Sequence, residues 1–71
     1  MTLKDATVGN KYIIENINTS DEDLCSFLFS LGCYSGEELT LISKLRHNCV
    51  VAIKNTRYSM DNKLAEAILL S

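Results

Sequence analysis

The sequence predicts a small, mostly β domain in which one α-helix lies between the first two of five short strands. Apolar residues recur at the spacing of one helix face, at Leu24, Phe27, Leu28 and Leu31. Two glycines after this run mark tight turns. The segments on either side are short, rich in branched apolar residues and separated by polar turns, which is typical of strands.

The chain before the helix reads as a lead-in followed by the first strand. Residues 2–8 form the lead-in, with Leu3 as its expected anchor, and a Gly-Asn pair marks the next turn. Residues 11–17 then form the first strand. Ile13 and Ile14 are adjacent, which breaks strict alternation. If both lean inward, the strand must contain a bulge or a sharp bend.

Capping signals bound the central helix. Ser20 is the expected N-cap, because its hydroxyl can accept a hydrogen bond from a free N–H of the first turn. The acidic residues at 21–23 then face the positive end of the helix dipole. Gly32 ends the helix, since glycine adopts the left-handed conformation at little cost. We expect the whole apolar stripe to plug the core.

The remainder of the chain reads as a meander closed by a last short strand. The second strand covers 38–45, with Leu39, Leu41 and Leu45 on one face. The third and fourth strands cover 49–54 and 57–60. Asp61 caps a helical turn before the strand at 68–70. Five short strands with one inserted helix predict a partly open barrel of the SH3-like or OB-like kind, forming a single domain over residues 1–71.

Charge and hydropathy exclude several classes of function. The chain has 71 residues, with seven basic against nine acidic residues and a formal charge of −2. The basic residues are scattered, whereas a nucleic-acid surface needs them clustered, so we expect no nucleic-acid partner. No apolar run approaches the roughly 20 residues of a membrane span. The N-terminus lacks the apolar segment of a signal peptide, so we expect a cytoplasmic protein without membrane insertion.

Soft metal ligands are present but lack the spacing of a metal site. The three cysteines and the single histidine are ligand types that suit zinc or iron, and they are Cys25, Cys33, Cys49 and His47. Their separations match no zinc finger or ribbon, and cysteines also serve as small buried hydrophobes. We therefore expect no tightly bound cofactor. Cys33 and His47 lie at turns and are expected to be exposed, so they are the only candidates for a weak iron or zinc site.

No catalytic constellation is visible. Nucleophilic catalysis needs a Cys or Ser beside a base that a third group orients, and the one histidine stands in a polar turn. The acidic run at 21–23 is explained by the helix dipole. The glycines are isolated and form no phosphate-binding loop. The sequence therefore predicts a protein that is not an enzyme.

Aromatic residues near the end of the helix form a candidate surface for a protein partner. Phe29 falls off the apolar stripe, and Tyr34 lies inside the turn between the two glycines. Together with Cys33 they would lie close together where the chain reverses. In the alternative interpretation, Phe29 seals the end of the barrel and Tyr34 packs under the first strand. Exposure of both rings would favour the binding surface.

The order of these elements resembles the FeoA family. That family has a helix ending in leucine-glycine, a turn closing on a second glycine and then a strand, which match Leu31-Gly32, Gly36 and the strand from Leu39. The N-terminal leucine and turn glycine, and the closing segment YSMDNKLAEAIL, also follow its pattern. Three turn positions depart from it, where Ser35, Asn55 and Asp61 replace the usual proline, glycine and basic residue.

The resemblance implies an SH3-like barrel and a role in bacterial ferrous-iron uptake. It implies a cytosolic accessory protein that binds a membrane iron transporter of the FeoB type, which carries a GTPase domain. The same fold is similar to the C-terminal domain of iron-dependent repressors, which leaves a metal-sensing regulatory module that binds a transition metal as the alternative. The open edges of such a barrel predict a monomer or weak homo-oligomer.

Overall fold

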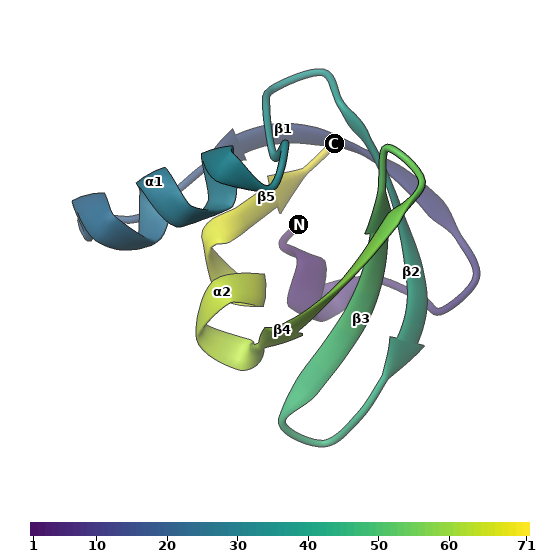
Figure 1. The fold of residues 1–71 in the computed structure, drawn as a ribbon. Helices are drawn as coiled ribbons and strands as arrows, with labels where there is room; N and C mark the ends of the chain where they lie inside the picture. The colour runs from purple at the N-terminus through teal and green to yellow at the C-terminus, as the bar shows by residue number, and fades with distance from the viewer.

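A single five-stranded antiparallel sheet forms the framework of the computed structural model, which describes all 71 residues (Figure 1). The strand order is β4-β3-β2-β1-β5, and the sheet is not closed, because β4 and β5 are its edges. The strands are β1 (Lys11–Ile17), β2 (Glu38–Lys44), β3 (Asn48–Ile53), β4 (Thr56–Asp61) and β5 (Ile68–Leu70). The helical elements are the 3-10 turn η1 (Leu3–Asp5), α1 (Glu22–Ser30) and α2 (Asn62–Ala67). The predicted mostly β fold and element order are confirmed.

One face of the sheet carries the core. In β2 and β3 the buried residues alternate along the strand, as expected for a sheet with one face toward solvent. Leu3 anchors the N-terminal turn and is 1% exposed, as the sequence predicts. The largest fully buried side chains are Leu3, Ile14, Leu28, Leu39, Leu41, Ile53, Met60, Ile68, Leu70, Val51 and Cys33.

The bulge predicted in β1 is present, but only one isoleucine turns inward there. The pairing of β1 with β5 shifts register between Ile14 and Asn16. Ile14 is completely buried, whereas Ile13 is 44% exposed. The expectation that both side chains lean inward is therefore wrong, because adjacent residues of a strand point to opposite faces even beside a bulge.

A second register shift explains why Leu45 leaves the core. The pairing of β2 with β3 shifts between Leu41 and Ser43, and β2 ends at Lys44. Leu39 and Leu41 are fully buried as predicted, but Leu45 is 63% exposed at the hairpin between β2 and β3. The even spacing of the three leucines fails as a guide to burial because one extra residue reverses the alternation.

The helix α1 packs against the core along part of its predicted apolar stripe. Leu28 is buried and Leu24 and Leu31 are partly buried against the core, whereas Phe27 is not, which corrects the expectation that the whole stripe plugs the core. It extends away from the sheet (Figure 1), and Leu28 is its only buried residue. Phe27 is 50% exposed, so its assignment to the core face is wrong. The N-cap is Asp21 rather than Ser20, since the Asp21 carboxylate accepts hydrogen bonds from the N–H groups of Asp23 and Leu24.

The C-terminal elements follow the sequence prediction. The Asp61 carboxylate accepts a hydrogen bond from the N–H of Leu64 at 2.9 Å and so begins α2 as its N-cap. Neither α1 nor α2 is long and apolar enough to cross a membrane.

Candidate functional site

The end of α1 is a Schellman motif that fixes the turn after it. The N–H of Gly32 donates to the carbonyl of Phe29, and the N–H of Cys33 donates to the carbonyl of Leu28. Gly32 has φ of 97°, which favours glycine. A Cβ placed on it would meet Ile53 and Lys54 at 3.6 and 3.7 Å, so the glycine packs against the hairpin between β3 and β4.

Two further hydrogen bonds tie this turn to the first strand. The N–H of Gly36 donates to the carbonyl of Ile14 at 2.7 Å, and the N–H of Ile14 donates to the carbonyl of Glu37 at 2.8 Å. Because both ends of the segment are bonded to rigid elements, Tyr34 has a defined place beside the end of α1.

Phe29, Tyr34 and Lys54 form an exposed cluster at this place, which we call the aromatic cluster. The two rings stack with their centroids 5.9 Å apart and an interplanar angle of 17°. The Lys54 ammonium lies 5.4 Å from the centre of the Tyr34 ring. Phe29 is 41% and Tyr34 48% exposed, so neither ring is part of the core. The interpretation that Phe29 seals a barrel end is therefore wrong.

Cys33 does not belong to this surface. Its side chain is completely buried and belongs to the same core cluster as that of Leu28. An apolar contact between residues at these two positions commonly accompanies a Schellman motif. Burial raises the pKa of the Cys33 thiol to about 11. The expectation that Cys33 is exposed at a turn is wrong, because the turn directs this side chain inward while Tyr34 and Ser35 are exposed.

The candidate metal ligands are not brought together. Cys33 precedes β2 and His47 follows it, and a seven-residue strand spans about 20 Å. His47 is exposed as expected. Cys49 is buried, which raises the pKa of its thiol. Nowhere do three or more His, Cys, Asp or Glu side chains form a group that could hold a metal ion.

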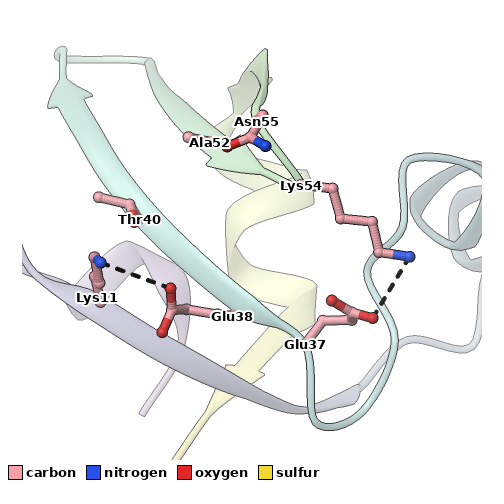
Figure 2. A pocket seen from close by; sticks show the side chains of 7 residues that line it. All are labelled: Lys11, Glu37, Glu38, Thr40, Ala52, Lys54 and Asn55. Atoms are coloured by element: carbon pink, nitrogen blue, oxygen red, sulfur yellow. Dashed lines mark ion pairs between the residues drawn. The ribbon is translucent and has the colours of Figure 1, made fainter.

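A shallow hollow of about 410 Å³ adjoins the aromatic cluster on the outer face of the sheet (Figure 2). Glu38 points toward Lys11 at 3.9 Å, and Glu37 points toward Lys54 at 3.5 Å. The two carboxylates therefore face opposite ways and are each balanced by an ammonium group. The hollow offers neither soft ligands nor converging carboxylates, so its chemistry suits polar surface contacts. Its lining is Lys11, Glu37, Glu38, Thr40, Ala52, Lys54 and Asn55.

Two exposed residues of this region, Phe27 and Lys54, carry no signal of their placement in the sequence. The helical spacing puts Phe27 on the apolar face of α1. Spacing alone does not show that the contact between this face and the core is too narrow to cover the Phe27 ring. The sequence places Lys54 at the end of the predicted third strand, with no role in a binding surface. Its approach to Tyr34 depends on the hairpin folding next to the end of α1, which sequence spacing does not show.

These features define a class of protein: a small SH3-like domain with an exposed aromatic cluster and no grouped metal ligands. The chain belongs to the FeoA family, because the sequence model of the FeoA domain matches residues 1–71. Family membership supports a role in ferrous-iron transport. No curated protein sequence matches the chain.

Solved structures share the fold. FeoA from Stenotrophomonas maltophilia, in complex with zinc and described as an SH3 domain protein, superposes with a TM-score of 0.90 at 20% identity, covering 100% of this chain and 89% of that one. Iron(II) transport protein A from Clostridium thermocellum gives 0.90 at 23% identity, covering 100% and 44%. A manganese-dependent transcriptional repressor gives 0.91 at 18% identity, covering 99% and 40%. The SH3-like fold predicted from the sequence is confirmed.

Proposed function

We propose that this chain is a non-enzymatic accessory protein of ferrous-iron uptake. It acts at the cytosolic face of the membrane by binding the GTPase-bearing part of an FeoB-type ferrous-iron transporter. Family membership supports the transport role. The observation that carries the proposed mode of action is the aromatic cluster, in which Phe29 and Tyr34 are both exposed and stacked on one another.

Such a cluster has the properties of a binding anchor. Binding energy in protein interfaces is concentrated in a few aromatic and arginine side chains near the centre of the contact. The stacked rings are already ordered by each other and by the bonded turn, so little side-chain entropy is lost when a partner covers them. The hydroxyl of Tyr34 can remain at the polar rim while its ring is covered.

The test is calorimetric titration of the purified cytosolic part of the transporter with wild-type protein, Tyr34→Ala and Phe29→Ser. We expect each variant to keep the wild-type thermal midpoint and to lose affinity by about tenfold or more. Leu45→Ser is the matched control, because Leu45 is an exposed apolar residue at the far hairpin. Full affinity of Tyr34→Ala at an unchanged thermal midpoint would show that the cluster is not the interface.

The metal-sensing alternative has less support in this chain. The zinc complex of the Stenotrophomonas maltophilia FeoA and the ScaR structure with bound Cd²⁺ show metals in proteins of this fold. Here, however, the Cys33 thiol is buried and protonated at neutral pH, and His47 lies at the other end of β2. Any metal would therefore have to bind weakly at single surface ligands.

A further inference from the structure

A second exposed aromatic residue lies on the other side of α1. Phe27 is 50% exposed, and it stands two positions before Phe29. Residues two apart on an α-helix are separated by about 200° around the axis, so these two rings lie on opposite flanks. Leu28, between them in the sequence, turns toward the core and is completely buried. Leu24 and Leu31 are partly buried against the core, so the helix packs on its own domain along one face and carries an aromatic ring on each flank.

The outer side of α1 is small, polar and exposed. Ser26 and Ser30 lie on it, both exposed to solvent. Figure 1 shows that α1 extends from the sheet, with its N-terminal end joined to β1 by a short connecting segment. A partner can therefore contact the helix on the Phe27 flank, on its outer side and over the part of Phe29 that Tyr34 leaves exposed, without displacing any part of the sheet.

The charge carried by α1 itself has one sign, whereas Lys54 of the β3–β4 hairpin lies beside its C-terminal end. Every charged residue between Lys11 and Lys44 is acidic. Glu37 and Glu38 are balanced by lysines, but Glu22 and Asp23 of α1 form no ion pair. The helix also carries no basic residue in its last turn. A partner that encloses α1 must therefore present basic groups around an apolar surface.

We propose that α1 inserts as a helix into an apolar groove with a basic rim on the cytosolic part of the transporter. Both flanks of the helix are in contact there, with Phe27 on one wall and Phe29 on the other. Helix-in-groove docking is a recurring recognition mode that uses apolar anchors from one short helix. A basic rim suits this partner, because cytoplasmic segments of membrane proteins next to their spans are rich in Lys and Arg.

This inference rests on the proposed function and makes a narrower claim. A partner lying flat on the aromatic cluster would contact Phe29 and Tyr34 and leave Phe27 in water. A groove requires Phe27 as well, and it covers the outer side of the helix at Ser26. These two residues therefore separate the groove from a flat contact.

The experiment measures affinity of the purified cytosolic part of the transporter for Phe27→Ser, Phe29→Ser and Ser26→Arg. Thermal melts verify that each variant is folded, and Ser26→Arg is expected to fold because an exposed arginine is a good helix residue. We expect all three to weaken binding by about tenfold or more, while Leu45→Ser binds as wild type. The double variant Glu22→Gln/Asp23→Asn should lower the association rate and its dependence on salt.

The outcomes distinguish the two claims. Full affinity of Phe27→Ser and Ser26→Arg, with loss only for Phe29→Ser, would overturn the groove and leave the transporter contact intact. An association rate of the double charge variant equal to the wild-type rate at low salt would overturn the basic rim. Absence of any binding by the wild-type protein would overturn the proposed function itself.

Discussion

The Lys54 ammonium lies over the ring of Tyr34, 5.4 Å from its centre, although the two residues belong to different turns of the chain. Lys54 stands in the hairpin between β3 and β4 with φ of 51°, and Asn55 beside it has φ of 67°. Positive φ at both positions is typical of the two-residue hairpins whose twist matches the strands. This hairpin geometry places the ammonium between Tyr34 and the Glu37 carboxylate, 3.5 Å away.

Replacing Lys54 by glutamine should therefore cost only a small amount of stability. Its two contacts are exposed to solvent, and exposed cation–π and ion pairs contribute about 0.5–1 kcal/mol each at most. We expect a loss of roughly 1 kcal/mol or less in urea unfolding, and no loss for the control Lys63→Gln, which removes an exposed lysine that forms no ion pair. Equal stability of the two variants would show that the contacts of Lys54 with Tyr34 and Glu37 together contribute nothing.

Truncation of Leu28 should cost much more stability than truncation of Phe27. Leu28→Ala removes the only buried side chain of α1 and leaves a cavity, so we expect a loss of about 2–5 kcal/mol in urea unfolding. Phe27→Ala removes a larger side chain that is half exposed, and we expect about 0.5 kcal/mol or less. A loss below half a kilocalorie for Leu28→Ala would show that the helix adds nothing to the core.

Sequence reasoning worked where local signals act and failed where tertiary packing decides. The element order, the glycine end of α1 and the Asp61 cap follow from local conformational preferences, which spacing reveals. The predicted burial of Phe27 and Leu45 was wrong for two different reasons. The contact of α1 with the core is narrow, and a register shift in β2 reverses the alternation before Leu45. The spacing of apolar residues shows which of them lie on a common face of a helix or strand. How many of these residues are buried depends on how much of that face the neighbouring elements cover.

The candidate site was predictable in part for the same reason. Phe29 and Tyr34 follow from the helix spacing and the turn glycines, and the structure places their rings in contact. Cys33 was misplaced because spacing does not show which side chain of a tight turn faces inward. Lys54 and Phe27 depend on long-range placement, so the sequence alone offered no signal for them.

Thiol labelling of the folded protein should modify one cysteine. Cys33 and Cys49 are buried and burial raises the pKa of each thiol, so both stay protonated and inaccessible near neutral pH. Cys25 is half-buried and should react. We expect mass spectrometry after brief iodoacetamide treatment to locate the label on Cys25 alone. Rapid labelling of Cys33 at neutral pH would contradict its place in the core.

The same buried thiol should make stability fall in alkaline solution. The pKa of Cys33 is about 11 in the folded protein, against an ordinary value of 9.0. The unfolded chain therefore releases this proton first, so the contribution is fully present below pH 9 and is lost as pH rises toward 11. Urea unfolding of wild type and Cys33→Ala across this range should show a shallower pH slope for the variant. Parallel slopes would contradict the assignment to Cys33.

Removal of metal should not unfold the protein. The structure groups no three metal-ligating side chains, and a structural metal would add its binding energy to folding. We expect the thermal midpoint to be the same before and after treatment with a chelator. The control is addition of zinc after the chelator is removed. A large drop on chelation that zinc reverses would reveal a structural site that these side chains do not suggest.

Self-association should be weak because the open edges of the sheet are short or charged. The edge strand β4 presents Arg57 to solvent, and an exposed charge on an edge disfavours pairing with another copy. At the other edge β5 has only three residues, and Thr2 already forms a bridge with Leu69 there. We therefore expect light scattering to give a monomer, or a dimer that dissociates on dilution to sub-micromolar protein. Arg57→Val, which makes the β4 edge apolar, should strengthen self-association. A stable assembly of the wild-type protein that persists on dilution would contradict this account of the edges.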